Sequence, residues 1–186
     1  MNNILPMDEL NRLDADLRGK YESGTLPKSK RDAEETEDLL LDYFLCAYSM
    51  GNETTNKSLA SEYSPSLDDV MGVIDAEVAG KTWRERVKGY FSDGGTVEDI
   101  SRIAATEAHR IANKAAYEAA KAAGAKTKTW HCMMLPTSRD THIYLDGVTA
   151  PIDGEFYSFK GDKTLYPGQW GIAEEDCNCM CFLTFE

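Results

Sequence analysis

The sequence predicts an α+β fold, with a mainly helical N-terminal two-thirds followed by a small C-terminal β-rich module. Apolar residues recur at spacings of three and four up to about Gly124, which is the pattern of amphipathic helices. The composition then changes from Ala, Leu and Glu to Gly, Pro, Thr and aromatic residues, and four of the five cysteines follow this change. We expect a helical N-terminal region over 1–80 and a second region over 81–186, with helices at 82–123 and the β-rich module at 127–186.

Two helices are predicted in the N-terminal region by apolar spacing. The first covers 8–18, where leucines recur at helical intervals, and the second runs over about 28–50. Gly51 is expected to interrupt the second helix, because glycine lowers helix propensity. Cys46 lies within this helix and is interpreted as a small buried hydrophobic residue.

Two further helices begin with capping signals. Ser66 is followed three positions later by Asp69, and Thr82 is followed at the same spacing by Glu85. In such a capping box the two side chains satisfy free backbone N–H groups at the start of the helix. Gly80 is expected to end the helix that Ser66 starts.

The strongest helical pattern runs from Thr96 to Gly124. At 100° per residue, an apolar stripe and a basic ridge fall on adjoining faces of this helix. The ridge consists of Arg110, Lys114 and Lys121. Two interpretations stay open: the ridge neutralises acidic helices around it, or it is a docking surface for an acidic partner or a nucleic-acid backbone. His109 is expected to face solvent.

The β-rich module is predicted from β-branched and aromatic segments separated by turn residues. Strands are expected near 127–133, at 156–159 and at 179–185, and Asp146-Gly147 is a hairpin-type turn signal. A module this short is marginal on its own, so either helices cover it or a staple holds it together.

The histidines and cysteines of the module are candidate zinc ligands, because thiolate and imidazole groups bind zinc. Cys177, Cys179 and Cys181 form a C-x-C-x-C run without a second cysteine pair, and on a strand they would share one face. Three interpretations stay open: a metal site, packed or hydrogen-bonded thiols, and a disulfide that involves Cys132. A Cys–His catalytic pair is a fourth interpretation.

The overall charge excludes several classes of protein. The formal net charge is −12 and the pI is near 4.7, which argues against a surface that coats nucleic acid or binds an anionic membrane. No apolar run is long enough for a membrane span, and the first residues lack the pattern of a signal peptide. We therefore expect a cytoplasmic product with reduced thiols.

Four different groups of residues follow one another along the second region. They are Gly80–Val87 around Trp83; Thr106, Glu107, Arg110, Asn113 and Tyr117; Lys128-Thr129-Trp130 with Arg139, His142 and Leu145-Asp146-Gly147; and Pro167-Gly168 with Asn178-Cys179-Met180-Cys181. This ordered set resembles the Mu F-like phage head-morphogenesis proteins, also called minor head or minor capsid proteins. Ala105 and Met180 depart from the arginines usual in that family.

The resemblance implies a virion protein rather than an enzyme, with no cofactor. Such proteins join head assembly at the portal vertex, so the implied partners are the portal protein and the major capsid or scaffold protein. The implied location is the capsid interior or the portal vertex, and the host cytoplasm during assembly. DNA contact would be weak, and no membrane is involved. The family-motif residues are Thr106, Glu107, Trp130, Asp146, Gly147 and Asn178.

The resemblance also bears on metal binding, because Cys-rich members of the family have the pattern of zinc binders. The corresponding ligands in this chain reduce to His142, Cys179, Cys181 and Asp176. The alternative function is a small zinc- or thiol-dependent enzyme that uses His142 with Cys179 or Asp146. Against it, the sequence has no complete catalytic motif such as H-E-x-x-H or G-x-S-x-G.

Overall fold

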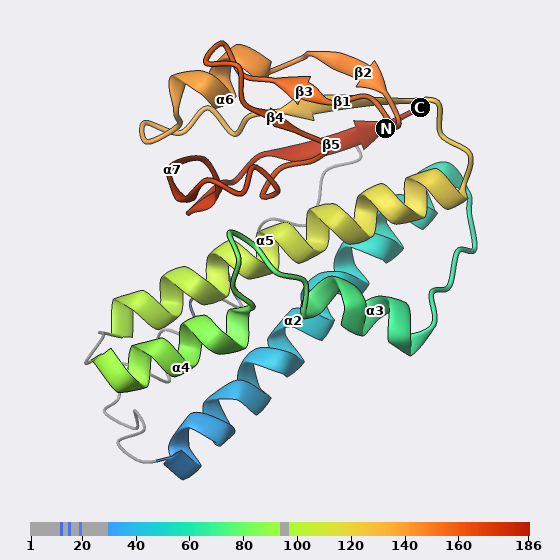
Figure 1. Cartoon of the computed structure of the whole chain (residues 1–186). Coiled ribbons are helices and arrows are strands. Elements are labelled where there is room, and N and C mark those ends of the chain that lie inside the picture. Colours follow the sequence, from blue (N-terminus) through green and yellow to red (C-terminus); the bar gives the residue numbers. More distant parts are fainter. Residues whose placement is uncertain (1–11, 13–14, 16–18, 20–29, 94–96) are drawn as a thin grey trace.

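The computed structural model describes residues 12, 15, 19, 30–93 and 97–186. The helix expected at 8–18 and the cap expected at Thr96 therefore lie outside the described residues, apart from single positions of that helix. The rest has the predicted α+β architecture, in which helices precede a module of short strands (Figure 1). Within the described residues, no helix is long and apolar enough to cross a bilayer.

The helical part contains α2 (Lys30–Leu59), α3 (Leu67–Ile74), α4 (Trp83–Asp93) and α5 (Val97–Ala122). The module contains β1 (Thr127–His131), α6 (Asp140–Leu145), β2 (Thr149–Pro151), β3 (Phe156–Tyr157), β4 (Lys163–Thr164), α7 (Ala173–Asp176) and β5 (Phe182–Phe185). Three of the strands form an antiparallel sheet in the order β2-β1-β5, and β3 pairs with β4.

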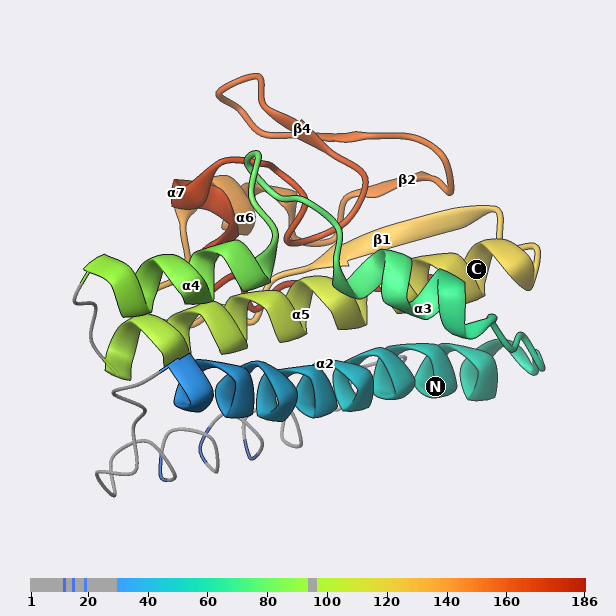
Figure 2. The same cartoon turned by 60° about the horizontal axis from the view of Figure 1, so that its bottom comes forward.

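Helix α5 lies between two layers (Figure 1 and Figure 2). On one side it packs against α2, α3 and α4, and on the other side the module covers it. The helical core includes Phe44 of α2, Trp83 of α4 and Ile111 of α5. Ala116 and Tyr117, also of α5, belong instead to the core of the module. Every residue from 107 to 113 is buried, so the middle of α5 has no solvent-facing side.

Helix α2 continues through the position where the sequence predicted a break. Gly51 is buried, and a Cβ atom at this position would lie 2.2 Å from the carbonyl oxygen of Ala112 in α5. Glycine is therefore required by the close approach of two helices rather than by a turn, and α2 extends to Leu59. The prediction for Cys46 was also wrong, because this thiol is exposed.

Both predicted capping boxes are present. The Ser66 and Asp69 pair caps α3 reciprocally, and Thr82 and Glu85 exchange hydrogen bonds of 2.8 and 3.3 Å at the start of α4. Helix α3 ends at Ile74 rather than at Gly80. Residues 75–82 instead form a loop, which a backbone bridge between residues 78 and 81 closes.

The module differs from the prediction in its turns. Asp146-Gly147 does not join two strands but links α6 to β2, and Gly147 has a φ of +75°. The last strand begins at Phe182, later than expected. The segment before it bends at Asn178, whose φ is +54°.

The contact at Gly51 gives a first prediction. We expect Gly51→Ala to lower the free energy of unfolding by about 1–3 kcal/mol, because the methyl group would overlap backbone atoms of α5. Gly72→Ala in α3 is the matched control: a Cβ atom at this position would have nothing within 4 Å, so the substitution should stabilise by up to about 1 kcal/mol. Urea denaturation measures the free energy of unfolding of both variants. Equal changes at the two glycines would contradict the conclusion that helix packing requires glycine at position 51.

Candidate functional site

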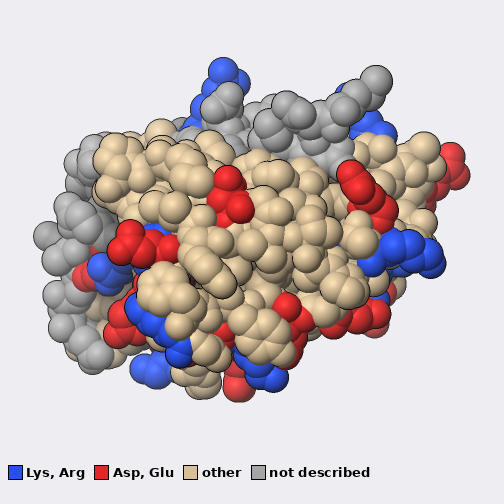
Figure 3. Space-filling view, turned by 90° about the horizontal axis from the view of Figure 1, so that it is seen from above, with Lys and Arg blue, Asp and Glu red and all other residues tan. Residues whose placement is uncertain are grey.

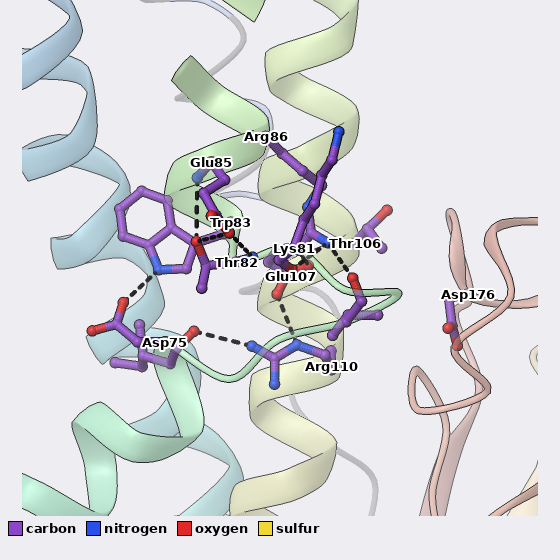
Figure 4. A network of polar contacts seen from close by, with 12 residues as sticks. Asp75, Lys81, Thr82, Trp83, Glu85, Arg86, Thr106, Glu107, Arg110 and Asp176 are labelled. Atoms are coloured by element: carbon purple, nitrogen blue, oxygen red, sulfur yellow. Dashed lines mark hydrogen bonds and ion pairs between the residues drawn. The ribbon is translucent and has the colours of Figure 1, made fainter. Parts of the chain in front are cut away.

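A buried ion pair on α5 is the centre of a polar network (Figure 4). Nε of Arg110 donates to Glu107 Oε2 over 2.7 Å, and both residues are at most 3% exposed. Arg86 of α4 donates to the other carboxylate oxygen of Glu107. The two terminal nitrogens of Arg110 donate to the carbonyl oxygens of Val73 and Ile74, over 3.0 and 3.1 Å. Both buried charges are thus paired and hydrogen-bonded, as a low-dielectric environment requires.

The same network explains where α3 ends. In a longer helix the carbonyls of Val73 and Ile74 would accept from residues 77 and 78. Here they accept from Arg110, and Asp75 accepts from Trp83 Nε1 over 3.0 Å and from Arg84 Nε over 3.3 Å. The chain can therefore leave the helix at Asp75 without orphaning the carbonyls of Val73 and Ile74.

Only part of the predicted basic ridge on α5 lies at the surface. Arg110 is buried and donates to carbonyl oxygens at the end of α3, so its assignment to a docking surface was wrong. Lys114 pairs with Glu118 at 2.9 Å, and Lys121 pairs with Asp153 at 2.6 Å. The interpretation that the basic residues neutralise acidic neighbours is the one that these contacts favour.

His109 is also internal, contrary to the prediction that it faces solvent. It is 5% exposed, and its Nδ1 has no hydrogen-bond partner among the described residues. Burial lowers the pKa of His109 to about 4, because a charged imidazole would lose its hydration without gaining a counter-charge.

Three motif residues of α5 attach the module to the helix. The Asn113 side chain donates to the carbonyl oxygen of Cys181 over 3.0 Å. Thr106 accepts from the backbone N–H of Asn178 over 3.2 Å, and the Tyr117 hydroxyl donates to Asp153 over 3.1 Å. The structure therefore brings the predicted motif residues Thr106 and Asn178 together, next to Glu107 on the same helix.

The other motif residues organise the module itself. Trp130 is fully buried and makes edge contacts with Phe156, Trp170 and His142, with ring centroids 5.2 to 5.9 Å apart. Asp146 accepts from the backbone N–H of Cys132 over 2.8 Å, which ties the end of β1 to the turn after α6.

Lys128 is a buried charge whose role the sequence did not indicate. Its Nζ donates to the carbonyl oxygen of Leu165 over 2.7 Å and lies 4.8 Å from the ring centroid of Tyr117. Burial lowers the pKa of Lys128 to about 8. The carbonyl and the aromatic face partly replace the water that the ammonium group loses.

Three of the four predicted metal ligands come together. His142 Nδ1 lies 3.6 Å from Cys179 Sγ and 3.4 Å from Cys181 Sγ, and all three side chains are buried. The bend at Asn178 breaks the strand geometry that would have placed the three cysteines on one face. Hydrogen bonds from Cys181 and His142 lower the pKa of the Cys179 thiol, and the same pairing raises the pKa of Cys181.

A carboxylate that the sequence did not single out supports the imidazole from its other side. Glu175 Oε2 lies 3.2 Å from His142 Nε2, at an angle that does not make a hydrogen bond. The same oxygen accepts from the Thr141 hydroxyl over 2.7 Å, and Lys160 lies 3.4 Å from Oε1. Burial raises the pKa of Glu175, but the contacts with Thr141, Lys160 and His142 outweigh it, so the pKa is lowered. No motif spacing marks Glu175, since it reaches His142 only through the fold.

Asp176 is the fourth predicted ligand and does not join the group. Its two carboxylate oxygens accept from the backbone N–H groups of Trp170 and Gly171, over 2.9 and 2.7 Å. Among the described residues, His142, Cys179 and Cys181 form the group whose ligand atoms all lie within 4.8 Å of one another. Asp176 therefore stabilises the loop before α7.

A cleft of about 540 Å³ opens beside this cluster. His142 and Cys181 form part of its wall, together with Cys132, His109 and Arg139. The cluster is thus buried on the side of Glu175 and lies next to an open space on the other.

Comparison with known proteins agrees with this arrangement of motifs. The family model described as Phage Mu protein F like protein matches residues 60–184. The chain therefore belongs to the Phage Mu F-like family, as the resemblance indicated, and the match begins before residue 81.

Two curated relatives are similar to the chain over part of their length. Minor head protein GP7 of Bacillus phage SPP1 is 33% identical over 85 residues, which cover 44% of this chain and 28% of GP7. NAD(+)--arginine ADP-ribosyltransferase EFV of Enterococcus faecalis (strain ATCC 700802 / V583) is 29% identical over 148 residues, which cover 61% of this chain and 30% of EFV. The chain spans less than a third of either relative. No solved structure matches significantly.

The buried ion pair gives a second prediction. We expect Arg110→Met to lower the free energy of unfolding by about 3–5 kcal/mol, because it leaves two carbonyls and part of the Glu107 charge without their partner. Lys114→Met one turn later is the control and should change stability by at most about 1 kcal/mol, since its pair with Glu118 is partly exposed. Chemical denaturation at pH 7 compares them, and similar losses would contradict the central role of Arg110.

The burial of His109 gives a third prediction, which concerns pH. The neutral ring is favoured in the folded state, whereas in the unfolded state the pKa is about 6.5. Stability should therefore be fully present above pH 6.5 and should fall as the pH drops towards 4. Between pH 6.5 and pH 5 we expect the wild type to lose about 1.6 kcal/mol more than His109→Leu. Equal slopes in denaturant titrations of the two proteins would contradict this.

Proposed function

We propose that this chain is a minor head protein that binds the portal protein at the portal vertex during head assembly. Membership of the Phage Mu F-like family supports a role in the phage head, and one relative carries the name minor head protein. The proposed location is the capsid interior or the portal vertex of the virion, with assembly in the host cytoplasm. The major capsid or scaffold protein is a further proposed contact.

One surface of the module supports this proposal. Five large apolar side chains are 38% to 58% exposed on α6, on the turn after it, on β3 and just beyond β3. They are Ile143, Tyr144, Val148, Tyr157 and Phe159. Figure 3 looks onto the module and shows a broad area with few charged side chains, most of which lie towards its margins.

Charged residues make up 28% of the whole chain, so we call this area with few of them the apolar face. Tyr144 and Phe159 already contact each other edge to face, with ring centroids 5.8 Å apart. Exposed aromatic clusters of this kind are typical of protein–protein contact sites. We therefore assign portal binding to this face, and not to Lys114 and Lys121, which pair with acidic neighbours.

Charge also bears on contact with DNA. A protein with a net charge of −12 repels the phosphate backbone, and the lysines of α5 that could oppose this repulsion are paired. We propose that the chain lies near packaged or ejected DNA and binds it weakly.

The proposed role is not enzymatic. In the alternative, His142 would act with Cys179 or Asp146, but the Asp146 carboxylate accepts from the backbone of Cys132 and does not join the cluster. The enzyme name of EFV belongs to a protein of which this chain covers 30%.

The face gives a fourth prediction. We expect Tyr157→Asp/Phe159→Asp to weaken binding to purified portal rings at least about tenfold, because charges would enter an apolar contact. Lys114→Glu/Lys121→Glu is the control for the basic ridge and should bind within about twofold of the wild type. Both pairs are at least partly exposed, so thermal melts should show that the variants fold.

Binding is measured by co-sedimentation with portal rings and by surface plasmon resonance at physiological salt. A wild-type chain that does not bind portal rings would overturn the proposed partner. Loss of binding in the lysine variant, with binding kept in the aromatic variant, would overturn the proposed face.

A further inference from the structure

We propose that His142, Cys179 and Cys181 bind one zinc ion, and that its fourth coordination position opens into the adjacent cleft. The proposal is independent of portal binding, since the apolar face that we assign to the portal uses other residues. It concerns the chemistry of the buried cluster alone. The observations that support it are the spacing of the three ligand atoms, the support behind His142 and the position of the cleft.

The spacing of the ligand atoms fits a tetrahedral zinc site. Zinc–sulfur bonds of about 2.3 Å and zinc–nitrogen bonds of about 2.0–2.1 Å place sulfur and nitrogen about 3.6 Å apart on a tetrahedron. His142 Nδ1 lies 3.4 and 3.6 Å from the two sulfurs, and all three ligand atoms fall within 4.8 Å of one another. The two nitrogen–sulfur distances thus match those of a tetrahedral zinc site.

The chemistry of the three donors favours zinc over harder cations. Two thiolates and one imidazole suit zinc, whereas magnesium and calcium prefer oxygen ligands. Asp176, the oxygen donor that the sequence suggested, is occupied by two backbone N–H groups. A divalent ion would also balance the charge of two buried thiolates, which the surrounding apolar side chains cannot do.

The support behind His142 is the type found around metal-bound histidines. Such rings usually direct their second nitrogen at a carboxylate, which fixes the tautomer and makes the ring a better ligand. Glu175 lies on this side of the ring, 3.2 Å from Nε2 but not at a hydrogen-bonding angle, and Thr141 donates to the same carboxylate oxygen. With a proton on Nε2, the lone pair of Nδ1 faces the two sulfurs. Glu175 is therefore a positioning residue that would act through His142.

The cleft defines the fourth position. His142 and Cys181 belong to its wall, so a metal ion between them would face the open space. Cys132 lines the same cleft but is not within the cluster of ligand atoms. We therefore assign the fourth position to water in the isolated protein. Three protein ligands with an exchangeable fourth one distinguish this site from a closed structural site.

A metal ion here would also tie separate parts of the module together. His142 lies in α6, whereas Cys179 and Cys181 precede β5. The ion would therefore link segments that are 37 to 39 residues apart in the chain, which matters for a module of short strands. We expect chelation to lower the thermal midpoint of the chain for this reason.

The test uses the full chain, purified with a reductant and without a chelator. Elemental analysis should give one equivalent of zinc, and replacement by Co²⁺ should give the visible d–d bands of tetrahedral cobalt with thiolate charge-transfer bands. Cys179→Ser and Cys181→Ser should each lose the metal or reduce the thiolate bands. Cys46→Ser, at an exposed thiol on α2, is the matched control and should keep the full spectrum.

Cys132→Ser tests the fourth position and should also keep one equivalent of metal and unchanged thiolate bands. If Cys132→Ser loses as much metal as Cys179→Ser, Cys132 is a ligand, and the proposal of an open fourth coordination position is overturned. Should the cluster variants fail to fold, titration of the metal-free wild type with Co²⁺ still decides the question. A folded wild type without stoichiometric zinc and without thiolate–cobalt bands would overturn the site. Portal binding does not enter this assay, so the two proposals can fail separately.

Discussion

The burial of α5 from both sides is the constraint on which the rest of the structure depends. Its middle turns carry Glu107, His109, Arg110 and Asn113, all of which lie inside the protein. Charged groups in such a position need partners within the fold, because each unpaired one costs about 1–3 kcal/mol or more, whereas His109 is accommodated as a neutral ring. The partners of Arg110 and Glu107 come from α3 and α4, and those of Asn113 come from the segment before β5. One helix therefore determines where both layers sit.

Local signals in the sequence were sufficient for much of the helical part. The capping boxes at Ser66 and Thr82 were predicted because their partners lie three residues away. The positions that failed depend on contacts across the fold. Gly51 meets Ala112 of another helix, and Arg110 meets carbonyls more than 30 residues away. A helical wheel shows how apolar and polar residues are distributed around one helix. It cannot show that a second layer of the protein covers the polar face.

The candidate site was predicted in its composition but not in its geometry. Cys179, Cys181 and His142 stood out because thiols and imidazoles are few in this chain, and the family resemblance selected among them. Their convergence depends on the left-handed backbone of Asn178 and on the placement of α6, which no pattern in the sequence specifies. Glu175 and Asp176 are adjacent acids with opposite outcomes: one faces His142 and the other caps a loop. Side-chain direction at such a short helix follows from tertiary packing alone.

The segment 178–181 is the junction between the two layers, and this position links the buried site to the exposed face. Thr106 and Asn113 of α5 hold its backbone from the helical side. Its cysteines contact His142 on α6, and the next residues of α6, Ile143 and Tyr144, belong to the apolar face. The buried polar contacts of α5 and the cluster at His142 both act at this junction, which accounts for the concentration of motif residues around it.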